Sequence, residues 1–171
     1  MFSGKTTELL RRLDEYPCGK ALAFKHVIDT RYSASAIVSH GGKASPSIVV
    51  ADADDIERHV TDKLEMVAID EAHFFDPSLV DVVARLAERG LDIVLTSLQP
   101  DSWGRTFPVA ERMLAIADEP IVTTATCARC GAVADRTQRL TPIIDGQMVV
   151  EPDNYEPRCR NCWQPPREPP S

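Results

Sequence analysis

The feature that most constrains the fold is a strand, a helix and a second strand in immediate succession near the middle of the chain. An apolar run at 66–69 ends in the acidic pair Asp70-Glu71, and a second apolar run follows at 93–96. Between them, residues 77–89 carry apolar side chains at helical spacing, and Gly90 is a helix stop. Two strands joined by a helix run parallel, so the sequence predicts an α/β protein with a parallel sheet.

Apolar periodicity and turn residues predict the remaining elements. We expect further helices over 8–13, 52–59 and 109–117. We expect a turn leading into a buried strand over 18–26, strands over 36–39, 47–50 and 121–125, extended segments over 132–138 and 147–150, and a loop over 29–35.

Composition and charge exclude several classes of protein. Of the 171 residues, 43% are hydrophobic and 26% are charged, which is typical of a globular chain and not of a disordered one. The 26 acidic and 19 basic residues give a net charge of −7, which argues against a nucleic-acid partner. No apolar run approaches the ~20 residues that cross a bilayer, and no export signal is seen. We therefore expect a cytoplasmic protein with no membrane partner.

Four of the five cysteines fall in two pairs, Cys127-Ala-Arg-Cys130 and Cys159-Arg-Asn-Cys162. In a chain without an export signal, such pairs are typical of metal ligands and not of disulfides. Two such turns complete a closed tetrahedral site, so we predict that these four thiolates hold one structural Zn²⁺. The alternative is a group of reduced, buried thiols. The fifth cysteine, Cys18, lies in an apolar stretch and is expected in the core.

A phosphate-binding motif stands at the start of the chain. Ser3-Gly4-Lys5-Thr6 precedes a predicted helix and matches the second half of a P-loop, with a Lys for the terminal phosphates and a hydroxyl for Mg²⁺. The full pattern, G-x-x-x-x-G-K-[ST], would place its first Gly before Met1, and the strand that delivers such a loop is absent as well. We interpret this as a start codon assigned too late. Alone, the motif is equally compatible with a surface turn.

The acidic pair Asp70-Glu71 strengthens the nucleotide interpretation. An aspartate at the end of a buried strand is placed to hold Mg²⁺ through water. A neighbouring glutamate is placed to orient or deprotonate a nucleophile. The alternative is a strand that ends in two solvated carboxylates, which becomes the weaker interpretation once a P-loop motif lies upstream.

Five motifs together resemble the type II, zinc-containing thymidine kinases over residues 1 to about 163. They are Met1-Phe-Ser-Gly-Lys-Thr-Thr-Glu-Leu9, Asp29-Thr-Arg31-Tyr32, Ile69-Asp-Glu71-Ala-His-Phe-Phe75, Arg136-Thr-Gln-Arg139-Leu140 and Tyr155-Glu-Pro-Arg-Cys159-Arg-Asn-Cys162. Each motif is modest alone, and their common order is highly specific.

The resemblance implies a RecA-like P-loop parallel sheet flanked by helices, with a small C-terminal zinc-binding β-hairpin or lasso module. It implies a P-loop nucleotide-binding domain over 1–126, a zinc-binding lid over 127–163 and a disordered Pro-rich tail over 164–171. The implied reaction transfers the γ-phosphate of ATP to the 5′-hydroxyl of thymidine or deoxyuridine, with Mg²⁺ and a structural Zn²⁺. Its partners would be ATP and a pyrimidine deoxynucleoside, and its assembly a homotetramer.

The resemblance also implies a role for each site residue. Glu71 would be the general base that takes the proton from the 5′-hydroxyl, and Thr6 and Asp70 would hold Mg²⁺. The residues near ATP and its phosphates would be Met1, Phe2, Ser3, Gly4, Lys5, Thr6, Asp29, Arg31, Asp70 and His73. The nucleoside would be bound by Phe74, Leu98, Ser102, Trp103, Arg139 and Tyr155, with Tyr155 on the loop that the zinc site holds down.

The chain departs from the family pattern at three further places. Ser102 stands where the family has a stacking Phe, and Trp103 compensates if the loop shifts by one residue. The lid segment 149–155 lacks the usual glycines. His73 replaces the customary Gln, and we expect it to bond the phosphate region or water and not to act as a base.

Two alternatives stay open at this point. Asp70-Glu-Ala-His73 spells the DEAH box of helicase-type ATPases, but one lobe of sheet and a four-cysteine module do not fit such a motor. The other alternative is a degenerate, nucleotide-binding homologue with little kinase activity.

Overall fold

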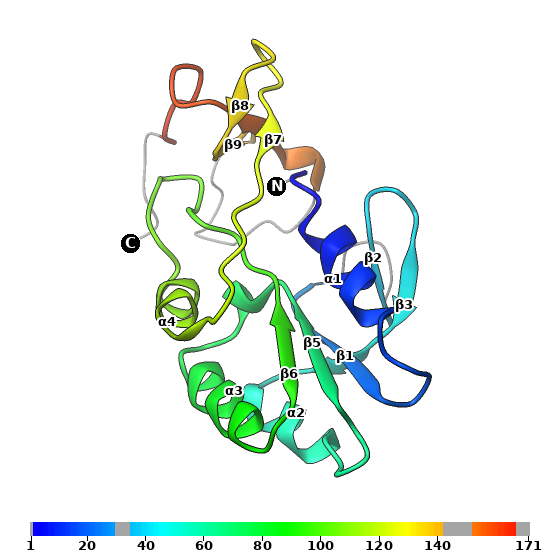
Figure 1. Ribbon diagram of the computed structural model, residues 1–171. Helices are drawn as coiled ribbons and strands as arrows, with labels where there is room; N and C mark the ends of the chain where they lie inside the picture. The colour runs from blue at the N-terminus through cyan, green and yellow to red at the C-terminus, as the bar shows by residue number, and fades with distance from the viewer. Residues whose placement is uncertain (1, 30–34, 142–151, 167–171) are drawn as a thin grey trace.

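The computed structural model describes residues 2–29, 35–141 and 152–166. Its centre is a sheet of four parallel strands in the order β4-β1-β5-β6 (Figure 1). The strands are β1 (Ala21–His26), β4 (Ile48–Val50), β5 (Met66–Asp70) and β6 (Asp92–Leu95). The predicted α/β class and the parallel pairing of the two central strands are confirmed.

One face of the sheet is covered by the first helix, α1 (Lys5–Leu13). Successive side chains of a strand point to opposite faces, so alternate residues of β5 reach this side. Met66 and Ala68 pack there against Leu9 and Leu10, all of them fully buried. This contact holds the start of α1 against the sheet.

The other face carries three helices (Figure 1). Val67 and Ile69 of β5 point to this side and lie in a larger apolar cluster. The cluster includes side chains of α2 (Ala53–His59), α3 (Ser78–Glu88) and α4 (Pro108–Ile116). Helices on both faces explain why every residue of β5 is buried and why its sequence is almost continuously apolar.

Antiparallel pairs complete the structure. β2 (Ala36–Val38) and β3 (Ala44–Pro46) form a hairpin beside the sheet. In the part that carries the cysteines, β7 (Ala125–Thr126) pairs with β8 (Val133–Ala134). There β9 (Arg136–Arg139) also pairs with β10 (Tyr155–Arg158). The short 3₁₀ turn η2 (Pro152–Asn154) comes just before β10. Figure 1 shows these strands beyond the carboxyl ends of the sheet strands, on the side where the chain begins.

Two predictions about local structure are wrong. The strand predicted over 121–125 is absent at 121–124, where Ile121 and Val122 are 51% and 85% exposed. Apolar content alone does not make a strand without a neighbour to complete its hydrogen bonds. Cys18 is exposed, because the chain turns there before β1 begins. The extended segment predicted over 132–138 is present as two strands, β8 and β9, with different partners, and the segment over 147–150 lies outside the described residues.

Within the described ranges, no helix is both long and apolar enough to cross a membrane.

Candidate functional site

The phosphate-loop motif has the backbone shape that phosphate binding requires. Gly4 is the N-cap of α1, with φ 81° and ψ 10°. This left-handed conformation is easy for glycine and strained for other residues, so a glycine at this position permits the turn. The amides of the first turn of α1 are thereby left pointing out of the helix, toward the carboxyl edge of the sheet.

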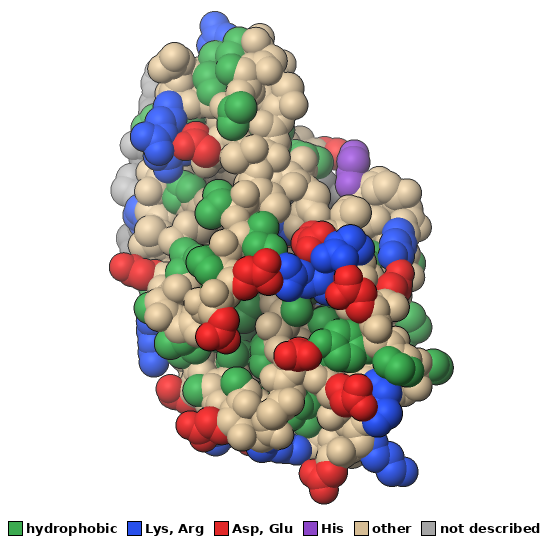
Figure 2. Space-filling model, viewed as in Figure 1, with side chains coloured by type: hydrophobic (Ala, Val, Ile, Leu, Met, Phe, Trp, Pro, Cys, Tyr) green, Lys and Arg blue, Asp and Glu red, His purple; other side chains and the backbone are tan. Residues whose placement is uncertain are grey.

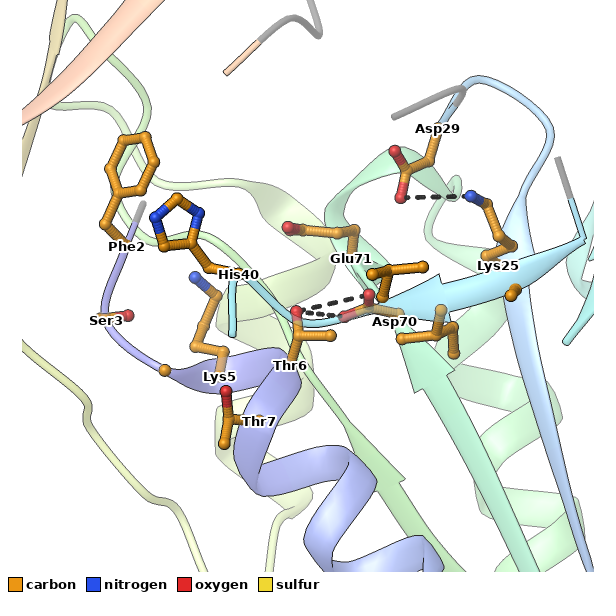
Figure 3. A pocket seen from close by; sticks show the side chains of 14 residues that line it. Phe2, Ser3, Lys5, Thr6, Thr7, Lys25, Asp29, His40, Asp70 and Glu71 are labelled. Atoms are coloured by element: carbon orange, nitrogen blue, oxygen red, sulfur yellow. Dashed lines mark hydrogen bonds and ion pairs between the residues drawn. The ribbon is translucent and has the colours of Figure 1, made fainter. Parts of the chain in front are cut away.

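This loop and the ends of β1 and β5 enclose a cavity of about 220 Å³. Figure 3 shows side chains from α1 and from the end of β5 converging on it. At its mouth, the rings of Phe2 and His40 meet edge to face, with centroids 5.6 Å apart. The predicted residues that the structure brings to this cavity are Phe2, Ser3, Gly4, Lys5, Thr6, Asp29, Asp70 and Glu71.

Asp70 is the most firmly oriented carboxylate of the cavity. It is 5% exposed, and the Thr96 hydroxyl donates a hydrogen bond of 2.5 Å to its Oδ1. The Thr6 hydroxyl lies 3.4 Å and 3.5 Å from its two oxygens, as the dashed lines in Figure 3 mark. Helix α1 and strand β5 thus bring a hydroxyl and a carboxylate together, which is the oxygen donor set that Mg²⁺ prefers.

Glu71 follows Asp70 in an unusual backbone conformation. Its φ of 51° and ψ of 50° are left-handed, which costs a non-glycine residue about 1–3 kcal/mol. The bond from its backbone N–H to the Thr96 hydroxyl, 3.0 Å long, helps to hold that conformation. The side chain lines the cavity and is 5% exposed. A buried carboxylate in a strained, fixed position is typical of a reactive group.

Thr96 was not predicted as a site residue, yet its hydroxyl bonds both members of the acidic pair. We expect Thr96→Val to lower the free energy of unfolding by about 1–3 kcal/mol, because Val matches the shape but removes these two buried bonds. Thr96→Ser keeps the hydroxyl and should cost less. Urea denaturation of both variants tests this, and equal losses would contradict the assigned role of the hydroxyl.

His73 lies behind the acidic pair and does not line the cavity. It belongs to the 3₁₀ turn η1 (Ala72–Phe74), and its ring packs 4.8 Å from that of Phe107. The Leu98 N–H lies 3.2 Å from His73 Nδ1, and Glu71 Oε2 lies 3.3 Å from the same ring nitrogen. His73 therefore contacts the carboxylate of the acidic pair from outside the cavity.

A buried ion pair lies at the far side of the cavity. Lys25 Nζ is 3.9 Å from Asp29 Oδ2, and the two side chains are only 2% and 7% exposed. Lys25 also stands opposite Asp70 in the parallel ladder of β1 and β5. It was not predicted as a site residue, although a lysine inside an apolar strand is a usable signal.

The nucleoside candidates do not line this cavity. Phe74 and Leu98 are half-buried near its edge, and Ser102 is 6% exposed in a tight loop. Arg139 and Tyr155 are cross-strand neighbours in the β9–β10 pair. Burial raises the pKa of the Tyr155 hydroxyl, although the nearby Arg139 charge lowers it in part. Trp103 is partly buried beside Ser102, with the Arg105 guanidinium 5.1 Å from its ring centre.

The four paired cysteines form one cluster. Their Sγ atoms all lie within 4.8 Å of one another, and Cys130 Sγ is 3.6 Å from Cys159 Sγ. Four thiolates around Zn²⁺, each at about 2.3 Å, would be about 3.8 Å apart, so the cluster fits this ion. Each pair makes a tight turn, closed by Gly131 N–H to Cys127 O at 2.9 Å and by Cys162 N–H to Cys159 O at 3.1 Å.

The surroundings of Cys127 favour the ionised form of its thiol. Burial opposes ionisation of Cys127, but backbone amides of Cys159, Arg129 and Cys130 outweigh it and lower the pKa of this thiol to about 6. The neighbouring thiols of Cys130 and Cys159 raise the pKa of Cys162 to about 12. A thiolate surrounded by further sulfur donors is typical of a metal-binding site.

Three predicted parts of the site lie outside the described residues. They are Met1, Arg31 and the portion of the lid segment over 149–151.

Comparison with known proteins adds two findings. The family described as Thymidine kinase matches residues 1–163. A thymidine kinase of Mesoplasma florum is 39% identical over 180 residues, covering 96% of this chain and 87% of that relative. The matched residues 1–163 include the phosphate loop, the acidic pair and all four clustered cysteines.

Proposed function

Because this chain belongs to the thymidine kinase family, we propose that it transfers the γ-phosphate of ATP to the 5′-hydroxyl of thymidine, with deoxyuridine as a second substrate. One observation carries the proposal. The phosphate loop with Lys5 and Thr6, and the acidic pair Asp70-Glu71, line the same cavity. That is the arrangement phosphoryl transfer needs, because the reaction depends on positioning and charge neutralisation.

The triphosphate would lie along the loop at the start of α1. Amides of the first helical turn would bind its oxygens, and Lys5 would reach the β- and γ-phosphates. Thr6 and Asp70 would hold Mg²⁺, which neutralises phosphate charge when bound. Asp29 and Arg31 would stand near the phosphates, as the family resemblance implies. His73, which the resemblance also assigns there, would act only through its contact with Glu71.

Glu71 would then act on the nucleoside. As the 5′-oxygen forms its bond to the γ-phosphorus, the bond from that phosphorus to the ADP oxygen breaks. The hydroxyl proton passes to the Glu71 carboxylate, and ADP leaves with the electron pair. The position of Glu71 in the lining of the same cavity as Lys5 and Thr6 supports this role, because a general base must lie within reach of the proton that it takes.

The base and sugar would be held beyond the edge of the cavity. Phe74 and Leu98 would contribute apolar contacts, and Ser102 and Trp103 would flank the base. Arg139 would order this pocket, while Tyr155 would close over the nucleoside. In this assignment residues 1–126 bind the nucleotide and residues 127–163 form a zinc-held lid. Gln164, predicted as the first residue of a disordered tail, is instead held by two hydrogen bonds to Gln138. The cytoplasmic location and tetrameric assembly stay predictions.

The surface does not favour a nucleic-acid motor. In Figure 2, acidic and basic side chains alternate over α1, where Arg11 and Arg12 pair with Glu8. Hydrogen bonds from these two guanidiniums lower the pKa of Glu8 to about 2. The negative charge of Glu8 therefore already pairs with the positive charges of Arg11 and Arg12. This face therefore offers little free positive charge to a phosphate backbone.

The test is an ADP-release assay with ATP, Mg²⁺ and a panel of acceptors. We expect release to be stimulated by thymidine and deoxyuridine, weakly or not at all by other nucleosides, and not by DNA or RNA. Stimulation by nucleic acid would replace the proposal with the ATPase alternative. Tight ATP binding with no stimulation by any nucleoside would identify a degenerate homologue.

A further inference from the structure

A tryptophan at the end of the cysteine cluster packs on the loop that carries Ser102 and Trp103. Trp163 directly follows Cys162, and its ring lies against Gly104. A Cβ atom on Gly104 would come within 3.1 Å of Trp163 Cη2 and 3.5 Å of Cζ2. A Cβ atom at this distance is tighter than ordinary van der Waals contact, so the Trp163 ring or the loop would have to shift by a few tenths of an ångström, and the φ of 81° at Gly104 also favours glycine.

Trp163 is fixed from the side of the cysteine cluster. Its backbone N–H donates to Cys159 O at 2.9 Å, inside the turn that presents two of the thiols. The next residue, Gln164, exchanges two hydrogen bonds of 2.8 Å with the side chain of Gln138 on β9. The Arg136 guanidinium lies 5.6 Å from the centre of the Trp163 ring. The position of the ring therefore depends on the cluster and on β9.

The loop on the other side of the contact is a closed unit. The Asp101 carboxylate accepts hydrogen bonds from the backbone N–H groups of Trp103, at 2.9 Å, and Arg105, at 2.8 Å. The Asp101 backbone bonds Arg105 O at 2.9 Å and Gly104 N at 3.0 Å. Because these bonds tie the loop to itself, a displacement at Gly104 moves Ser102 and Trp103 with it.

We propose that Trp163 is a positioning residue that sets where the 101–105 loop lies, and so couples the cysteine cluster to nucleoside recognition. The role of this loop in nucleoside binding rests on the proposed function, whereas the contact between Trp163 and Gly104 does not. Trp163 acts through Gly104 and need not touch substrate. The metal site thereby influences the affinity for the nucleoside through packing, at a distance from the reacting atoms.

Gly104→Ala is the direct test, with Gly90→Ala as its matched control. Both glycines have φ above 80°, but a Cβ at Gly90 meets nothing within 4 Å. Both variants therefore carry the same backbone strain, and only the first pushes on Trp163. We expect Gly104→Ala to raise KM for thymidine by about tenfold or more, since small misplacements in a site are costly, and to leave KM for ATP within about twofold. Gly90→Ala should change neither.

A second variant, Trp163→Phe, distinguishes an effect of the Trp163–Gly104 contact from a general loss of structure. In Trp163→Phe the ring is smaller and leaves room for a methyl group, so adding Gly104→Ala there should raise KM for thymidine less than it does in the parent protein. Phe also removes the indole N–H, which has no acceptor among the described residues, so the single variant should keep its zinc content and most of its affinity.

Amide hydrogen exchange gives a readout that does not depend on activity. In Trp163→Ala the amides of 101–105 should exchange faster, while those of β5 stay protected and the zinc content is unchanged. Unchanged exchange in the loop, or equal effects of Gly104→Ala and Gly90→Ala, would overturn the coupling. If the parent protein phosphorylates no nucleoside, the proposed function fails, and the exchange measurement alone decides whether Trp163 holds the loop.

Discussion

Glu71→Gln is expected to lower kcat for thymidine phosphorylation by about 10²–10⁴, the usual contribution of a general base. The amide has the shape of the carboxylate but cannot take the proton of the 5′-hydroxyl. Glutamine pays the same backbone cost as glutamate at φ 51°, so the local fold should persist. Steady-state kinetics with varied ATP should show KM for the nucleotide within about threefold of the parent value, because Glu71 is not assigned to hold ATP.

The matched control, Glu88→Gln, removes one carboxylate charge at another position. Glu88 is exposed at the end of α3, far along the chain from every site residue of the phosphate loop. Glu88→Gln should leave kcat unchanged and show that the loss of one carboxylate does not by itself impair turnover. Unchanged turnover in Glu71→Gln would remove the general-base assignment, even if the protein is a thymidine kinase.

Cys159→Ser is expected to abolish tight metal binding. The protein purified under reducing conditions should contain about one zinc per chain, and this variant only a small fraction of that. Cys159 is 8% exposed at the centre of the cluster, and its carbonyl anchors the backbone of both Cys162 and Trp163. Loss of the metal should therefore also increase amide exchange across the β9–β10 pair, since structural zinc contributes directly to folding free energy.

Cys18→Ser is the control for the loss of a thiol. Cys18 is exposed and is not a member of the cluster, so this variant should keep the full zinc content. Elemental analysis of both variants beside the parent protein makes the comparison. Absence of zinc from the freshly prepared parent, or full zinc in Cys159→Ser, would contradict a four-cysteine site.

The sequence patterns predicted the central fold because local and long-range signals agree there. The apolar run of β5 is buried on both faces, and Gly4 can adopt the left-handed turn before α1 without steric cost. The cysteine pairs predicted their own proximity, because two such pairs in one chain are typical ligands of a single tetrahedral metal site. The structure then placed Asp70 beside Thr6 across 64 residues of chain, as the motifs had indicated.

Other features depend on contacts that no short pattern encodes. Thr96 looks like the last residue of an ordinary strand, and only the parallel pairing of β6 with β5 brings it to the acidic pair. Lys25, inside an apolar strand, carries a sequence signal, but its place opposite Asp70 depends on the pairing of β1 with β5. Trp163 is the last residue of the predicted lid, and its packing on Gly104 becomes visible only in three dimensions.

The wrong predictions share a physical cause. Residues 121–124 and Cys18 were assigned from apolar composition, which measures preference for burial but not the presence of a partner. Val122 is 85% exposed, and no strand covers it within the described part of the chain. Periodicity therefore predicted buried central elements better than elements at the margin of the sheet.

Transfer of the γ-phosphate from ATP to thymidine is tested by following the phosphate itself. ATP labelled on its γ-phosphate is mixed with the protein, Mg²⁺ and thymidine, and the products are separated. Label is expected on the 5′-oxygen of thymidine at the rate at which ADP forms. Label recovered only as inorganic phosphate, or retained in ATP while thymidine is present in excess, would contradict the proposed transfer to thymidine.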